Sequence, residues 1–224
     1  MTTSDAARRQ VRRAIGLGRL LPLGGPADGA WLSERAAATV LRDAGATAVP
    51  KAALGTIRLS LVAPDAAEEP TVPAPPTALW PGPLRVEADV SVWDLEEPLP
   101  ALTAALRAAL FETASDVLGL AVTTVDLRVR ELLDSAPEER PVPDAPAAVH
   151  PSDPAGTAAA ATPGVAHLTA TLGTAVHYGP DHVRVELATA PGHVALEVAR
   201  AARSTVAAAL SDDRAVTVVV TAVS

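Results

Sequence analysis

The stretch LRVEADVSVW, residues 84–93, decides the fold, because apolar and polar side chains alternate along its whole length. Every second residue from Leu84 to Val92 is apolar, and the residues between them are charged, serine or tryptophan. A period of two is typical of a strand that covers a core with one face and meets solvent with the other. The stretch therefore predicts a half-buried strand.

A helix and a second strand follow. Apolar residues recur at helical spacing over 99–118, and Gly119 is suited to end the helix. Residues 125–129 then alternate between apolar and charged side chains. Because the helix must bury its apolar stripe, we expect it to cover the apolar face of the sheet.

Two more elements are predicted upstream. Ser33 is placed to cap a helix that runs to about Ala44, with Gly45 in the left-handed position after its end. Residues 57–61 alternate in the manner of a strand.

The second half of the chain repeats this order of elements. Strands are predicted over 165–172, 183–187 and 215–223, and a helix over 193–210. The tripeptide Arg85-Val86-Glu87 recurs as Arg184-Val185-Glu186. The repeat indicates an internal duplication, with chance recurrence of an ordinary strand tripeptide as the alternative.

Proline-rich stretches divide the chain, and the predicted fold class is α+β, with small antiparallel or mixed sheets that are each covered by a long amphipathic helix. The two folded parts are expected to be related modules. The predicted units are a basic flexible tail (1–30), a first α+β module (31–133) with a proline-rich insertion (64–83), a linker (134–163) and a second, smaller strand–helix–strand module (164–224).

Composition excludes several classes of protein. The 224 residues contain no cysteine, which excludes a disulfide scaffold, a cysteine-based metal site and a cysteine nucleophile. A net charge of −8 argues against a nucleic-acid partner. No apolar run is long enough for a transmembrane helix.

No arrangement typical of an enzyme is present, and we expect no catalytic, cofactor-binding or metal-binding residues. The nucleophile elbow G-x-S-x-G is missing, and Lys51, the only lysine, lies outside any phosphate-binding loop. The second module holds His167, His177, His182 and His193, but their spacing does not fix two metal ligands on one face. The alternative is a small-ligand or metal-binding regulatory domain whose pocket is lined by His177, His182 and His193.

Two groups of residues are candidate interface residues. Trp93 falls on the polar face of its strand, beside Asp94, and an exposed tryptophan is typical of an interface. The first 30 residues carry a net charge of +3 and the rest of the chain −11. Arginines of this tail are suited to dock on an anionic membrane or an acidic partner. They are Arg8, Arg9, Arg12 and Arg13.

The order of motifs from the first strand onward is similar to a known family. An alternating strand is followed by a short acidic turn with proline, a long amphipathic helix, Gly119-Leu120 and a strand of alternating valines and charges. This pattern resembles the alkaline-shock, or general-stress, envelope-stress-response family of Gram-positive bacteria. Leu32-Ser33-Glu34-Arg35 resembles the opening of the family's first helix. Pro163-Gly164-Val165-Ala166 resembles its Pro-Gly-Val segment, and Val183-Arg184-Val185-Glu186 resembles the strand that follows. The chain departs from the family at Trp93-Asp94, at Leu118 and in the insertion 64–83.

The resemblance implies a divergent member with a second, partial module and a non-enzymatic scaffold role in the envelope-stress response. Proteins of this family are cytoplasmic, self-associate and are held beneath the membrane by a small membrane-anchor protein. We therefore expect a homo-oligomer, a small membrane-anchor partner, peripheral membrane association and a cytoplasmic, membrane-proximal location.

Overall fold

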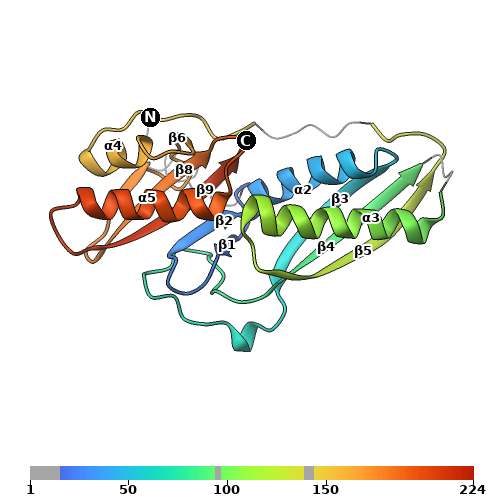
Figure 1. Ribbon diagram of the computed structural model, residues 1–224, viewed down its shortest axis with the longest axis horizontal. Helices are drawn as coiled ribbons and strands as arrows, with labels where there is room; N and C mark the ends of the chain where they lie inside the picture. Colours follow the sequence, from blue (N-terminus) through green and yellow to red (C-terminus); the bar gives the residue numbers. More distant parts are fainter. Residues whose placement is uncertain (1–15, 94–96, 139–143) are drawn as a thin grey trace, which may run out of the picture.

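The computed structural model describes residues 16–93, 97–138 and 144–224. Helices form one layer and strands form the other, with two sheets side by side along the long axis of the molecule (Figure 1). The predicted α+β fold class is confirmed.

The first sheet has three strands, in the order β3–β4–β5. β4 is antiparallel to β3 and parallel to β5, so α3 and its last turn form the crossover connection between the parallel strands. The strand predicted over 84–93 is confirmed at both ends. The elements are α2 (Glu34–Ala48), β3 (Ala52–Leu61), β4 (Leu84–Trp93), α3 (Leu99–Glu112), the π-helical turn η2 (Thr113–Leu118) and β5 (Val122–Leu133).

The second sheet has the order β1–β2–β9–β8–β6, with β7 also paired to β8. β8 and β9 are parallel and are connected through α5, whereas β6 is antiparallel to β8. The elements are β1 (Leu20–Leu23), β2 (Ala30–Ser33), α4 (Pro154–Ala160), β6 (Val165–Leu168), β7 (Val176–Tyr178), β8 (His182–Thr189), α5 (Ala195–Ala209) and β9 (Ala215–Val223). The sheets therefore do not follow the division at 134–163, because β2 from the first half pairs with β9.

Part of the predicted N-terminal tail is folded. Residues 1–15 lie outside the described residues, but Leu20–Leu23 forms β1 and is buried along its whole length. The hairpin of β1 and β2 is attached to α5 by an ion pair of 2.7 Å between Asp28 and Arg200. The Arg200 hydrogen bond lowers the pKa of Asp28 below its ordinary value. Both faces of this hairpin are covered, so it lacks the alternation that marks a half-exposed strand.

The first long helix corrects a detail of the prediction. Ser33 caps α2 as expected, since its hydroxyl accepts a hydrogen bond of 3.2 Å from Ala36 N. The helix then continues through Gly45 to Ala48. A Cβ atom on Gly45 would lie 2.8 Å from the Leu54 side chain. The glycine thus serves close packing of helix against strand rather than a left-handed helix end.

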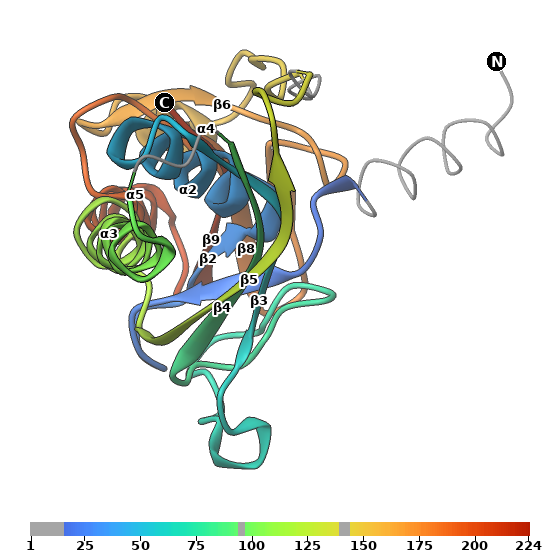
Figure 2. The same cartoon turned by 90° about the vertical axis from the view of Figure 1, so that its right-hand side faces the viewer.

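The proline-rich insertion 64–83, which we call the strap, leaves the first sheet after β3, packs against the second sheet and returns to β4. It contains one short helix, η1 (Pro64–Ala66), and runs on the side of the sheets opposite the helices (Figure 2). Trp31 Nε1 donates to Leu79 O at 3.0 Å, and Thr217 Oγ1 donates to Pro73 O at 3.1 Å. Val72 completes a small second core with Leu20, Trp31 and Val219.

The predicted linker 134–163 contains one helix. Residues 139–143 lie outside the described residues, and α4 forms over Pro154–Ala160. Asp153 caps it by accepting a hydrogen bond of 2.9 Å from Gly156 N. Its buried alanines pack with α5 and β6.

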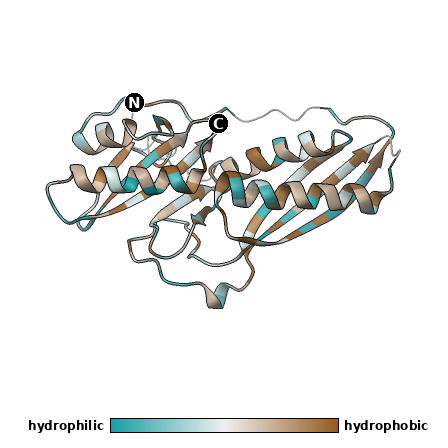
Figure 3. Cartoon of the chain, in the orientation of Figure 1, coloured by the Kyte–Doolittle hydropathy of each residue, from teal (hydrophilic) through white to brown (hydrophobic). Residues whose placement is uncertain are grey.

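The helices cover one face of each sheet and give the fold one continuous main core. Figure 3 shows brown bands that alternate with white and teal bands along the strands, as expected for sheets with one buried face. No helix among the described residues is long and apolar enough to cross a membrane.

Candidate functional site

Of the predicted interface residues, Trp93 is the one that the structure describes. It ends β4, opposite Leu133 of β5, and its side chain is half-buried. Asp94 and the tail arginines Arg8, Arg9, Arg12 and Arg13 lie outside the described residues.

Trp93 shares its face of the first sheet with a row of ion pairs, which we call the charge ladder. In each pair, the β4 residue does not contact the β5 residue directly opposite it. It contacts the residue two positions further along β5. Arg85 lies 3.4 Å from Asp126 and Arg130 lies 2.9 Å from Asp89, while Arg128 pairs with Glu87 between them. These side chains are partly exposed, so each pair adds little stability. The face is polar and internally neutralised, and no described segment covers it as the strap covers the second sheet.

The outer edge of β5 is the second feature of this region. No described strand pairs with it, and alternate residues of an edge strand present their N–H and C=O groups outward. Arg107 Nε satisfies the carbonyl of Val125 at 3.1 Å. Farther along, the side chains of Val129 and Leu132 are 39% and 60% exposed. This part of the edge is thus open and carries apolar side chains.

The repeated tripeptide occupies matching positions in the two sheets. Arg85 lies opposite Thr124 on the parallel neighbour of β4, and Arg184 lies opposite Thr217 on the parallel neighbour of β8. In each sheet an antiparallel strand flanks the other side. The environments differ, because the strap covers the second face and leaves the first face open.

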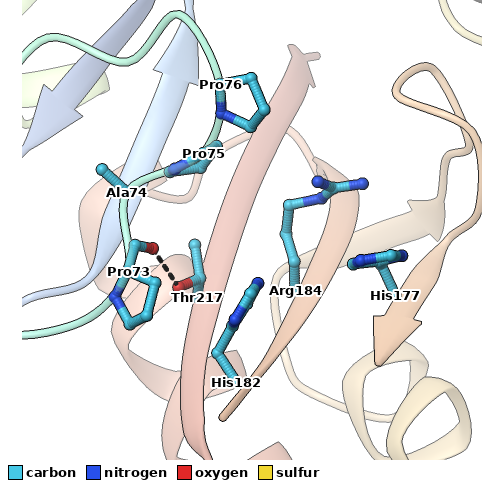
Figure 4. Close-up of a pocket in the computed structure, with 8 residues that line it drawn as sticks. All are labelled: Pro73, Ala74, Pro75, Pro76, His177, His182, Arg184 and Thr217. Atoms are coloured by element: carbon cyan, nitrogen blue, oxygen red, sulfur yellow. Dashed lines mark hydrogen bonds between the residues drawn. The ribbon is translucent and has the colours of Figure 1, made fainter. Parts of the chain in front are cut away.

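A cavity of about 290 Å³ lies between the strap and the second sheet (Figure 4). We call it the strap pocket, and it is lined by Pro73–Pro76, His177, His182, Arg184 and Thr217. Strand register explains the lining, since His177 of β7 and Thr217 of β9 both lie opposite Arg184 of β8. His182 precedes Arg184 by two positions and therefore lies on the same face.

Arg184 has a carboxylate neighbour deeper in the fold. Its Nη2 lies 3.4 Å from Oε1 of Glu186, whose side chain has no exposed surface. Glu186 Oε2 also accepts a hydrogen bond of 2.9 Å from Leu172 N. Burial raises the pKa of Glu186 to about 7, against the opposing effects of the Leu172 amide and Arg184. Near neutral pH this carboxyl is therefore only partly ionised, and it neutralises Arg184 incompletely.

The two histidines of the pocket lie near each other at its mouth. Their ring centroids are 6.3 Å apart. His182 Nδ1 lies 2.9 Å from Asp181, and this hydrogen bond lowers the pKa of the Asp181 carboxyl. His177 is exposed, but His182 is partly covered and begins a strand.

The pocket proposed from the sequence is right for two of its three histidines. His193 lies elsewhere, beside Gly164 near the start of α5. His167 is also outside the pocket, with Nε2 3.3 Å from Pro146 O. No group of three or more metal-ligating side chains occurs among the residues that the structure describes, which leaves the metal-binding alternative without a site there.

Comparison with protein-family models, curated proteins and solved structures found no match. Sequence reasoning missed Arg184, Thr217 and the prolines of the strap. The repeated Arg-Val-Glu tripeptide marked Arg184, but nothing local to the strap indicates which distant strand it covers.

Proposed function

We propose that this chain is a non-enzymatic scaffold of the envelope-stress-response type, which self-associates and is held near a membrane by a small anchor protein. One observation supports the self-association, namely the open edge of β5. The family resemblance of residues 84–133 supports the cellular role.

The charge pattern of β5 favours a second copy of this chain as the occupant of the edge. Antiparallel pairing about Leu127 sets Asp126 of one copy opposite Arg128 of the other, twice by symmetry. If the pairing is centred on Arg128 instead, Arg128 of one copy lies opposite Arg128 of the other. If it is centred on Asp126, Asp126 lies opposite Asp126. Opposite charges across strands stabilise pairing and like charges oppose it. The register centred on Arg128 also sets Asp126 opposite Arg130, but the register centred on Leu127 is the one of these three that brings no like charges opposite each other.

The membrane part of the proposal requires a partner. The described residues contain no helix able to cross a membrane. The arginine-rich segment of residues 8–13 is suited to assist contact with anionic lipid headgroups. The partner would be a small protein with its own transmembrane helix.

A matched pair of variants tests the self-association. Val129→Pro removes an N–H from an exposed position of an edge strand, where proline is tolerated by the fold. Val129→Ala keeps that N–H and serves as the control. In sedimentation velocity at tens of micromolar, we expect wild type and Val129→Ala to form dimers or larger species and Val129→Pro to be a monomer with unchanged circular dichroism. A monomeric wild type, or equal association of both variants, contradicts the proposal.

Cell fractionation tests the membrane part. The full chain should be recovered with membranes and should move to the soluble fraction when the gene for the anchor protein is deleted. Vesicles of phosphatidylglycerol and phosphatidylcholine give the complementary experiment. Flotation of the purified chain alone with such vesicles would show that no anchor protein is needed.

A further inference from the structure

We propose that the strap pocket binds a small oxyanion, that is, a phosphate, sulfate or carboxylate group carried by a small molecule. This site is separate from the β5 edge, and it makes the chain a receptor for a ligand as well as a scaffold.

The pocket lining supplies cationic donors and no carboxylate. Arg184, His177 and His182 are its ionisable residues, and the strap contributes only proline and alanine. Two carboxylates lie next to the lining. Asp181 is hydrogen-bonded to His182, and Glu186 lies beneath Arg184. An oxyanion in the cavity would therefore meet the three cationic or protonatable groups before either acid.

Arg184 has unused hydrogen-bonding capacity. A guanidinium offers five N–H donors in a planar fork that matches two oxygens of a carboxylate or phosphate. Arg184 Nε has no hydrogen-bond partner among the described residues; the same holds for Arg85 Nε, so the two arginines differ in the cavity that Arg184 lines and not in this donor. The contact of Arg184 with Glu186 is 3.4 Å, longer than a strong charge-assisted hydrogen bond. Arg184 lines the cavity, so an oxyanion there would meet the outer N–H groups of the guanidinium and not Nε, which presents almost no accessible surface.

The walls define the size and character of the ligand. About 290 Å³ is the lower end of the range for ligand pockets, which suits a molecule of metabolite size. The proline rings of the strap form one apolar, rigid wall of the pocket. The side chains of Arg184, His177 and His182 form the other wall. Thr217 holds the strap in place through Pro73 O, and its hydroxyl proton is thereby already committed.

Arg85 provides an internal control for this inference. It occupies the matching position in the first sheet, opposite Thr124, but its side chain is 41% exposed and pairs with Asp126. The same residue in the same register thus exists with and without a strap above it. Any general attraction of anions to arginine would act on both residues.

Isothermal titration of the full-length chain with sodium sulfate, at constant ionic strength, tests the site. We expect saturable binding of one sulfate per chain, weakened at least tenfold by Arg184→Met and unchanged by Arg85→Met. His177→Gln, at an exposed position that the fold tolerates, should weaken binding severalfold even if Arg184→Met fails to fold. Malonate and inorganic phosphate, as competitors of sulfate, distinguish a carboxylate ligand from a phosphate ligand.

Three results would overturn the inference. The first is that none of the three anions shows saturable binding. The second is that Arg85→Met and Arg184→Met lose the same amount of affinity for sulfate. The third is that Arg184→Met and His177→Gln both keep the wild-type affinity. Sedimentation of the same variants separates this site from the proposed scaffold, because neither Arg184 nor His177 lies on the β5 edge.

Discussion

Arg85 and Arg184 occupy the same position in two neighbouring sheets, each opposite a threonine of the parallel strand. Arg85 joins an open row of surface ion pairs, whereas Arg184 lies in a cavity with a buried carboxylate beneath it. The strap causes the difference. A proline-rich insertion that adds no regular sheet structure thus encloses a pocket on one of two similar faces.

The buried Glu186 should make stability depend on pH. Its pKa is raised to about 7 in the folded protein, above the value of about 4.3 in an unfolded chain. The folded state therefore binds more protons in this interval, and the group's contribution to stability is lost as pH rises from about 4.5 through about 7. The resulting change in the free energy of unfolding is at most about 4 kcal/mol. Urea unfolding followed by tryptophan fluorescence at pH 5.5 and 8.5 measures it.

Glu186→Gln is the variant that isolates this effect. It should unfold at a higher urea concentration than wild type at pH 8.5. Its free energy of unfolding should also decrease less than that of wild type between pH 5.5 and 8.5. Glu197→Gln, at a side chain that is 64% exposed, is the control. A wild-type pH dependence in Glu186→Gln would show that another group is responsible.

Trp31 should hold the strap closed. Its indole N–H donates to Leu79 O, and its ring lies in the small core with Val72. Trp31→Phe removes the hydrogen bond, at a cost of about 1 kcal/mol, and leaves space at the strap. We expect faster cleavage by a glutamate-specific protease at Glu68 and Glu69. Trp80→Phe, at a residue 46% exposed, should keep the wild-type cleavage rate.

The sequence predicted those elements whose side chains alternate between core and solvent. β4 and β9 are found at their predicted bounds, and the helix over 99–118 exists, although its last turn is π-helical. β1 was missed because both of its faces are covered, which removes the period of two. Gly45 was misread because a glycine that permits close packing is indistinguishable in sequence from one that ends a helix.

The site was less predictable than the fold. Two of its histidines were singled out, but Arg184 and Thr217 read as ordinary polar residues of a strand face. What makes them a site is a contact between residue 73 and residue 217, which depends on tertiary structure. Local patterns contain no information on such a contact, and the strap's prolines indicate only an irregular segment.

The packing of the helix corner at Gly119 against the start of α5 should depend on the absence of a side chain at this residue. This residue has φ of +74°, and a Cβ atom there would lie 2.4 Å from Leu196 Cβ at the start of α5. Gly119→Ala therefore combines backbone strain of about 1–2 kcal/mol with a steric clash. Gly192 has φ of +76° and nothing within 4 Å of the same atom. Gly192→Ala thus measures the strain alone, and we expect Gly119→Ala to lose about 2 kcal/mol more in urea unfolding. Equal losses would contradict a contact between the helix corner and α5.

The affinity of the strap pocket for sulfate should rise as pH falls from 8.5 to 6.0. Sulfate keeps its charge over this range, so the change reports on the protein. Four residues of the second sheet surround Arg184. They are His182 and Glu186 on β8, His177 on β7 and Thr217 on β9. Asp181 is hydrogen-bonded to His182, and the strap segment Pro73–Pro76 brings no charge. The pKa of Glu186 is raised to about 7 by burial, so this carboxyl loses its charge as pH falls below about 7. Protonation of Glu186 leaves the charge of Arg184 less neutralised, which makes the pocket more positive. Glu186→Gln should bind sulfate more tightly than wild type at pH 8.5 and show a smaller increase in affinity on acidification. Isothermal titration at four pH values checks this, and an affinity for sulfate that is independent of pH in the wild type would exclude the proton linkage.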